Sequence, residues 1–253
     1  MAKKAKKNRR TLSRESSRKS SDESSRESAG GQALIFDLDG TLVDSVYEHV
    51  LAWNEALQQE GIEYPSWAIH RRVGMSGSLF LHEVLGEISS RSGKRRGEIN
   101  VKRIQKLKKK NFAARLPQVQ VLPGAGELLK RLSHLGIPWA IATSGAKEEA
   151  APLLRLLKLP AHSLVVTGDE VKEAKPEPDI FMLAAERLRI PINNSIIVGD
   201  SVWDLLAARR AKTLGVGLLC GGYGQAELEG AGAYRVYKDP ADLLQHLGEL
   251  GIR

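Results

Sequence analysis

The sequence Ala33-Leu34-Ile35-Phe36-Asp37-Leu38-Asp39-Gly40 decides the fold of this chain. Its four leading apolar residues predict a short buried strand, and the Asp and Gly residues that follow predict a loop at the carboxyl end of that strand. Four other segments have the same form, because each is a short apolar run that ends in small or polar residues. They are residues 138–142, 163–166, 195–198 and 213–216.

Segments with helical spacing separate the predicted strands, at 125–135, 146–157, 179–189 and 202–211. Strands without polar alternation, each followed by a helix, are typical of a parallel sheet that helices cover on both faces. Residues 45–115 contain only helical spacing, as in Val46, Val50 and Trp53. We therefore predict an α/β fold with a Rossmann-like parallel-sheet core, residues 31–43 and 117–253, and a small α-helical cap domain, residues 44–116, inserted after the first strand.

The first 30 residues differ from the rest of the chain in composition. They hold ten Lys and Arg, four Asp and Glu, and eight serines, with almost no large apolar residue. Such a segment cannot bury enough apolar surface to offset the entropy of ordering it, so we predict a disordered, basic, Ser-rich tail. A basic tail can attract polyanions such as nucleic acid, or it can act only as a solubilising segment. We favour the second interpretation.

The composition excludes several classes of protein. The 253 residues include a single cysteine, Cys220, which excludes an internal disulfide framework and a cysteine-rich zinc site. The sequence has no run of about 18 apolar residues, so we expect no membrane partner. The basic N-terminus lacks the apolar stretch of a secretory signal, and we expect a cytoplasmic location.

Polar side chains follow the predicted strands at their carboxyl ends, which is where open parallel sheets bind ligands. Four of these side chains are carboxylates, which repel each other in one crevice unless a cation lies among them. Hard oxygen ligands in modest number suit Mg²⁺, and a lysine with a hydroxyl donor beside it completes a receptor for a phosphate dianion. The residues are Asp37, Asp39, Thr143, Ser144, Lys175, Asp200 and Asp204.

Taken together, four motifs resemble those of the haloacid dehalogenase superfamily. The first is Asp37-Leu38-Asp39-Gly40-Thr41-Leu42-Val43-Asp44-Ser45, and the second is Thr143 after Ala140-Ile141-Ala142. The third is Lys175-Pro176-Glu177-Pro178-Asp179-Ile180-Phe181, and the fourth is Gly199-Asp200-Ser201-Val202-Trp203-Asp204. They occur in the family's order, and the resemblance covers about residues 32–245. It implies a mobile helical cap, and it places the chain nearest the phosphoglycolate phosphatases and β-phosphoglucomutases.

The resemblance also implies a role for each motif residue. Asp37 attacks phosphorus and forms an aspartyl-phosphate, and Asp39 protonates the leaving alcohol and then deprotonates water. For the first of its two tasks Asp39 must hold a proton, so we expect its pKa to be raised. The phosphate ligands are then Thr143, Ser144 and Lys175, the Mg²⁺ ligands are Asp37, Asp39 (through its carbonyl) and Asp200, and Asp204 orients a metal-bound water.

The predicted cap region is basic, with thirteen Lys and Arg against eight Asp and Glu in residues 44–122. These charges can attract an anionic substrate, or they can form a solvated outer face, which is the interpretation that we favour. Three residues of the cap are candidates for contact with the substrate. They are His49 on the first helix, Ser76 in the loop Gly74-Met75-Ser76-Gly77, and Lys108 on the helix face that also carries Phe112.

The predicted function is that of a Mg²⁺-dependent phosphatase, acting through an aspartyl-phosphate on a small phosphorylated metabolite such as phosphoglycolate or a sugar phosphate. One alternative is a β-phosphoglucomutase-like phosphotransferase. His49 and Trp53 favour it, but Ser76-Gly77-Ser78 contains no arginine where the mutases hold a second phosphate.

Other reactions known for the fold agree less well with the sequence. A dehalogenase needs no carboxylate at position 39, and phosphonate cleavage needs a cap lysine that nothing in the sequence singles out. An alternative of another class is a polyanion-binding protein with a vestigial core. We expect no nucleic-acid partner beyond weak contact through the N-terminal tail.

Overall fold

The structure is a computed structural model, which describes residues 31–92, 99–173 and 175–253. The disorder predicted for residues 1–30 falls outside the described residues. Within them, the core is a six-stranded parallel sheet with the strand order β5-β4-β1-β6-β7-β8. The strands are β1 (Ala33–Phe36), β4 (Trp139–Thr143), β5 (Leu164–Thr167), β6 (Ser195–Gly199), β7 (Leu214–Leu218) and β8 (Ala233–Tyr237).

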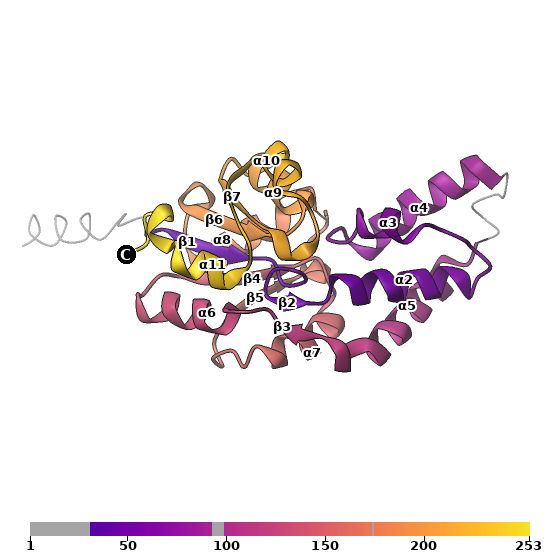
Figure 1. The fold of residues 1–253 in the computed structure, drawn as a ribbon, viewed down its shortest axis with the longest axis horizontal. Helices are drawn as coiled ribbons and strands as arrows, with labels where there is room; N and C mark the ends of the chain where they lie inside the picture. The colour runs from indigo at the N-terminus through magenta and orange to yellow at the C-terminus, as the bar shows by residue number, and fades with distance from the viewer. Residues whose placement is uncertain (1–30, 93–98, 174) are drawn as a thin grey trace, which may run out of the picture. The chain divides into compact units, whose positions relative to one another are not determined.

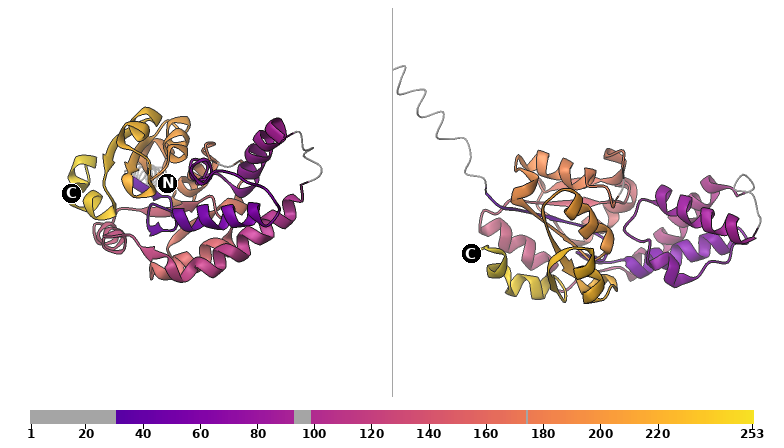
Figure 2. Two further views of the ribbon diagram at one scale, coloured as in Figure 1. Left: turned by 45° about the vertical axis from the view of Figure 1, so that its right-hand side comes forward. Right: turned by 90° about the horizontal axis from the view of Figure 1, so that it is seen from above.

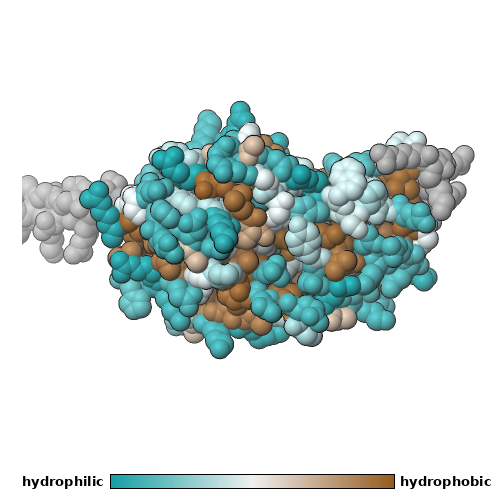
Figure 3. All heavy atoms as spheres, viewed as in Figure 1, coloured by the Kyte–Doolittle hydropathy of each residue, from teal (hydrophilic) through white to brown (hydrophobic). Residues whose placement is uncertain are grey.

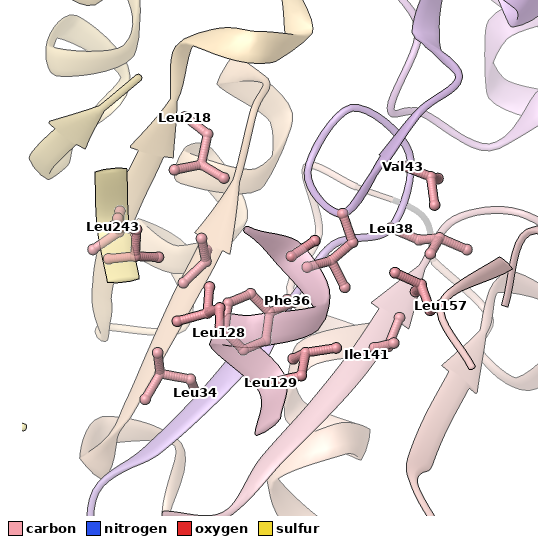
Figure 4. Packing of buried hydrophobic residues seen from close by; sticks show 14 of the residues in the cluster. Leu34, Phe36, Leu38, Val43, Leu128, Leu129, Ile141, Leu157, Leu218 and Leu243 are labelled. Carbon is pink, nitrogen blue, oxygen red and sulfur yellow. The ribbon is translucent and has the colours of Figure 1, made fainter. Parts of the chain in front are cut away.

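Different helices cover the two faces of this sheet. Leu34 and Phe36 of β1 belong to the hydrophobic cluster with α6 (Ala125–His134), α7 (Lys147–Leu156) and α11 (Pro240–Gln245). Figure 4 shows Phe36 in this cluster, with Leu128 and Leu129 of α6 close by. Ile35 belongs to the opposite cluster, with α8 (Asp179–Leu188) and α9 (Val202–Arg210). Because both faces are buried, the strands show no polar alternation in the sequence.

The predicted fold class is confirmed, and the predicted strands and core helices lie within about two residues of the observed ones. The strand β8 and the helix α10 (Gln225–Ala231) were not predicted. The strand lies at the edge of the sheet, and its Tyr234 and Arg235 are exposed, so it has no continuous apolar run. Edge strands with charged residues are a common way to prevent sheets from pairing with each other.

Residues 46–115, which we call the cap, lie between two short strands. Their described part contains α2 (Val46–Gln58), α3 (Ser66–His70), α4 (Gly77–Ser92) and α5 (Val101–Arg115). Figures 1 and 2 show α2 and α5 side by side, and the contacts between these two helices are extensive. The cap has its own hydrophobic cluster, with Trp53, Ile69, Phe80 and Ile104 buried in it. Most of the cap therefore packs around its own interior, while Ala52 and Phe112 belong to the cluster of the sheet.

The chain enters and leaves the cap through neighbouring strands. β2 (Val43–Asp44) pairs antiparallel with β3 (Gln120–Val121), with Val43 opposite Val121. The 3₁₀ turn Leu116–Gln118 connects α5 to β3. The chain therefore enters and leaves the cap at the same place, the paired strands β2 and β3.

The face of the molecule in Figure 3 is mainly hydrophilic, with apolar residues in scattered areas. Among the described residues, no helix combines the length and the apolar character needed to cross a membrane.

Candidate active site

β1 lies between β4 and β6 in the sheet. The strand order reverses at this point, because β4 and β5 extend the sheet on one side of β1 and β6, β7 and β8 extend it on the other. The carboxyl ends of such strands form the crevice in which open α/β sheets bind ligands. The structure brings the predicted strand-end residues together there, through ion pairs, hydrogen bonds and a shared cavity. They are Asp37, Asp39, Thr143, Ser144, Lys175, Asp200 and Asp204.

Lys175 lies at the centre of this group, in the loop between β5 and α8, and its side chain has no solvent exposure. Its Nζ is 2.5 Å from Asp37 Oδ1 and 2.8 Å from Asp204 Oδ1. Burial alone lowers the pKa of a lysine, but the carboxylates of Asp204 and Asp37 raise the pKa of Lys175 above its ordinary value. The site therefore contains a fixed positive charge directly beside Asp37.

Three buried carboxylates lie close together at the site, and two of them contact the lysine. One oxygen each from Asp37, Asp200 and Asp204 lies within 4.8 Å of the other two. Thr41 Oγ1 donates a hydrogen bond to Asp200 Oδ1 at 2.8 Å. Ser201 Oγ donates to Asp204 Oδ2 at 2.6 Å, which completes a capping box at the start of α9. Each carboxylate therefore has a fixed orientation set by its own partner.

Two glycines leave the space that Asp200 occupies. A Cβ atom at Gly221 would lie 1.8 Å from Asp200 Oδ2, and one at Gly40 would lie 2.4 Å from the same oxygen. Gly40 also has a φ of +79°, which residues with a side chain rarely adopt. Neither position can carry a side chain while Asp200 stays in place.

The electrostatics of the three carboxylates fit a divalent metal ion. Burial raises the pKa of Asp37 to about 7, with Asp204 and Asp39 adding to the effect and Lys175 opposing it. Burial, with the charges of Asp204 and Asp37, likewise raises the pKa of Asp200 well above its usual value. One lysine does not offset three buried carboxylates, whereas a hard cation such as Mg²⁺ would, and it prefers these oxygen ligands. The carbonyl of Asp39 as a further ligand stays a prediction.

Asp39 differs from its neighbours because α2 and the loop before it supply its partners. Its Oδ1 accepts a hydrogen bond from Ser45 Oγ at 2.6 Å and lies 2.9 Å from His49 Nε2. Burial raises the pKa of Asp39, but the charge and hydrogen bond of His49 and the hydrogen bond from Ser45 lower it to about 2. The raised pKa expected for Asp39 is therefore wrong, because these partners stabilise its ionised form.

The two hydroxyl residues at the end of β4 make different contacts. Thr143 Oγ1 accepts a hydrogen bond from the Gly145 amide at 3.1 Å and donates to Asp39 Oδ2 at 3.3 Å. Ser144 Oγ donates to the Gly74 carbonyl of the cap loop at 2.8 Å. The Ser144 hydroxyl therefore connects the cap to the core. The phosphate contacts predicted for both residues stay predictions.

A cavity of about 360 Å³ lies over Asp37 and Asp39, between the strand ends and the cap. The cap candidates His49 and Ser76 both line it. The imidazole of His49 is stacked on the ring of Phe112, with 3.9 Å between the ring centroids. This packing holds the imidazole against Asp39, so His49 is part of the site as well as of the helix interface.

The third cap candidate, Lys108 of α5, also lines the cavity and is almost fully buried. It forms an ion pair with Glu149 of α7, in the core. Its Nζ lies 5.6 Å from the centroid of the Trp53 ring and 5.1 Å from that of Phe112, within the range of cation–π attraction. Lys108 therefore links the cap, the core and the wall of the cavity.

Sequence reasoning assigned no role in the site to Thr41, Ser45 or Glu149. Thr41 and Ser45 lie within the first motif, so their closeness in sequence to Asp39 was a signal that they could contact the site. Glu149 meets Lys108 from 41 positions further along the chain, on a different helix. No local pattern predicts such a pair, because it depends on how the cap lies on the core.

Comparison with known proteins gives consistent results. The family model for haloacid dehalogenase-like hydrolases matches residues 32–212. Hexitol phosphatase A of Escherichia coli is 33% identical over 188 residues, which cover 71% of this chain and 79% of that protein. A phosphoglycolate phosphatase of Neisseria meningitidis is 35% identical over 203 residues, 78% of this chain and 83% of that protein. The crystal structure of a hydrolase from Pseudomonas syringae has a TM-score of 0.81 at 46% identity, and the match covers 87% of this chain and 99% of that one.

Proposed function

This chain belongs to the haloacid dehalogenase-like hydrolase family, and from that membership we propose that it is a Mg²⁺-dependent phosphatase of small phosphorylated metabolites. The observation that carries the proposal is the position of Asp37. Its carboxylate is paired with Lys175, belongs to the group of three buried carboxylates and lines the cavity under the cap. A carboxylate nucleophile, a fixed cation and a metal site in one place suit the transfer of a phosphoryl group.

In the first step, the Asp37 carboxylate attacks phosphorus and forms an aspartyl-phosphate, while the P–O bond to the alcohol breaks. Lys175, already 2.5 Å from Asp37 Oδ1, draws off negative charge from the phosphate oxygens. The Thr143 hydroxyl, which also lines the cavity, binds a phosphate oxygen. The carboxylates of Asp37 and Asp200 would hold Mg²⁺, and the bound ion would supply the positive charge that offsets the phosphate dianion.

In the second step, Asp39 accepts a proton from the water that hydrolyses the aspartyl-phosphate. Its ionised form suits this task. The alcohol that leaves in the first step takes its proton from the pair formed by Asp39 and His49, whose Oδ1 and Nε2 are 2.9 Å apart. Asp39 thus acts with its imidazole partner rather than as an isolated acid.

The test is hydrolysis of p-nitrophenyl phosphate and a panel of phosphorylated metabolites, measured with the purified full chain. We expect activity with Mg²⁺, loss of activity in EDTA, and recovery with Mg²⁺ but not with Zn²⁺. Asp37→Asn should abolish turnover while circular dichroism shows a folded protein. Asp44→Asn, at an exposed carboxylate of β2, is the matched control and should keep its activity. Phosphatase activity retained in Asp37→Asn would overturn the assignment of the nucleophile.

The contact between His49 and Asp39 favours a second candidate, a mutase-like phosphotransferase, because an assisted acid–base pair also serves transfer to a sugar hydroxyl. The two reactions give different products. Hydrolysis releases inorganic phosphate in step with substrate loss, whereas a mutase returns an isomeric phosphosugar with no net phosphate. Phosphorus NMR of a reaction on a hexose 1-phosphate separates them, and we expect free phosphate.

A further inference from the structure

The side chains that line the cavity determine which alcohol part of a phosphate ester can bind there. Within the described part of the chain, three Lys and Arg side chains line the cavity, and each of them has a carboxylate partner. Among the residues that the structure describes, the cavity therefore offers no unpaired Lys or Arg to a second anionic group on the substrate. The pairs are Arg72 with Glu87, Lys108 with Glu149, and Lys109 with Glu148 at 3.6 Å.

Besides Asp37 and Asp39, two carboxylates belong to the cavity lining, Glu149 and Asp169. Asp169 is held in place by hydrogen bonds from Thr167 Oγ1 at 2.7 Å and from the Lys147 amide at 3.1 Å. A substrate carboxylate, such as the one that phosphoglycolate carries, would meet these like charges. Beside Lys108 it would lie against the Glu149 carboxylate, which already neutralises that lysine in a largely buried ion pair. Like charges brought together in a partly desolvated site are strongly unfavourable.

A neutral group with several hydroxyls has no such conflict. The ammonium of Lys108 has three N–H donors, of which Glu149 needs only one, and the Glu149 carboxylate can accept several hydrogen bonds. Neighbouring hydroxyls of a polyol can donate to Glu149 and accept from Lys108 without separating the two charges. Trp53 and Phe80, whose ring centroids are 4.3 Å apart, also line the cavity and offer apolar surface to C–H groups. A volume of about 360 Å³ is typical of small-molecule sites.

We propose that Glu149, held by Lys108 across the boundary of cap and core, selects phosphate monoesters of neutral polyols or sugars over those of hydroxy acids. The inference rests on the proposed function, since it names the substrate class of that same site. Glu149 binds the alcohol part of the substrate and takes no part in the chemistry at phosphorus. Its effect is therefore on the choice between substrates.

The first test compares kcat/KM of the wild-type full chain on glucitol 6-phosphate, a neutral hexitol phosphate, with kcat/KM on phosphoglycolate. We expect the hexitol phosphate to be favoured by about tenfold or more. A preference for phosphoglycolate would overturn the inference. Hydrolysis of p-nitrophenyl phosphate separates the two proposals. If that hydrolysis depends on Asp37 and Mg²⁺ but the enzyme prefers phosphoglycolate, only the inference about substrate class fails. If p-nitrophenyl phosphate is not hydrolysed in this way, the proposed function itself fails.

The second test changes the charge of the proposed selector. Glu149→Gln keeps the size of the side chain and frees Lys108, so we expect the kcat/KM ratio to move towards phosphoglycolate by about tenfold. The matched control is Glu127→Gln, the same change at an exposed glutamate of α6 that lies outside the cavity lining. This control should keep the wild-type ratio. An unchanged ratio in Glu149→Gln, or an equal shift in both variants, would contradict the inference. If Glu149→Gln fails to fold, the wild-type comparison still decides.

Discussion

The ammonium group of Lys175 lies inside the protein, with no exposed surface and two carboxylates within 2.8 Å. A buried charge is tolerated only when it is paired, because the free-energy cost of taking it out of water exceeds the stabilisation that a contact with an uncharged group provides. Asp37 follows β1, and Asp204 lies in the first turn of α9. One side chain therefore joins Asp37 to the start of a helix that follows a different strand.

Replacing this lysine tests how far the site depends on that charge. In Lys175→Met the carboxylates of Asp37 and Asp204 lose their cation, so we expect the free energy of unfolding in EDTA to fall by about 3–5 kcal/mol near pH 7. Phosphatase activity should be lost as well. Urea unfolding followed by circular dichroism measures the first effect. Lys172→Met, at an exposed lysine of the same loop, is the control and should change stability by less than about 0.5 kcal/mol.

The identities of the site residues were predictable because each follows a strand end, and strand ends meet in a parallel sheet. Asp37 and Asp200 were found in this way. The charge state of Asp39 was not, because it depends on Ser45 and His49, which reach it from the cap side. The pair of Lys108 with Glu149 was not predictable either. The sequence shows which residues follow a strand, but it does not show which side chains from other helices and loops pack against them.

At the scale of elements, the turn after β7 decides whether Asp200 can keep its place. This 3₁₀ turn, Leu219–Gly221, brings the Gly221 backbone against the Asp200 carboxylate. Cys220 in the same turn donates from Sγ to the Gly40 carbonyl at 3.1 Å, which joins the turn to the loop after β1. Two loops from different strands therefore enclose one carboxylate.

A methyl group at Gly221 should disturb the metal site without unfolding the protein. In Gly221→Ala the added Cβ would overlap Asp200 Oδ2, so the carboxylate must move. We expect kcat with Mg²⁺ to fall by about 100-fold, since displacements of about 1 Å have effects of this size. A titration of activity with Mg²⁺ measures it. Gly230→Ala in α10, with no neighbouring atom within 4 Å of the added Cβ, should keep full activity. Equal activity in the two variants would show that Asp200 tolerates the shift.

The short strands β2 and β3 are a different case from the core strands. They have two residues each, which is too short for an alternating or continuous apolar pattern to stand out. The core strands were predictable because burial on both faces leaves long apolar runs, whereas pairing of two-residue strands depends on where the cap begins and ends.

At the scale of the whole described fold, several contacts hold the cap against the core. The Arg71 carbonyl, just after α3, accepts hydrogen bonds from Tyr223 OH at 3.0 Å and from Trp203 Nε1 at 3.1 Å. The Arg71 guanidinium lies 4.7 Å from the centroid of the Tyr223 ring. With Ser144 bonded to Gly74, these contacts hold the cap loop at the cavity that Asp37 and Asp39 line.

Removing one of these contacts should weaken closing of the cap. Tyr223→Phe keeps the ring under Arg71 but loses the hydrogen bond, which contributes about 1 kcal/mol. If cap closing completes the site, kcat/KM should fall by about fivefold. Steady-state kinetics on p-nitrophenyl phosphate measures the effect. Tyr234→Phe, at a half-exposed tyrosine of β8, should have none. An unchanged kcat/KM in Tyr223→Phe would show that this contact does not limit catalysis.

Deletion of residues 1–30 tests the alternative of a polyanion-binding protein. The family match begins at residue 32, so the deletion should leave kcat/KM within about twofold of the full chain. Gel-shift with nucleic acid at varied salt, with and without these residues, measures polyanion binding. We expect weak, salt-sensitive binding that the deletion removes. Tight binding that survives both the deletion and high salt would favour the alternative.

The pairing of Val43 with Val121 brings together the two places where the chain enters and leaves the cap. The segment between Asp44 and Gln120 begins and ends at one pair of short strands, so its length can vary without a change in the strand order of the sheet. A cap of another size can therefore be accommodated at this junction while Asp37, Lys175 and Asp200 keep their places in the core.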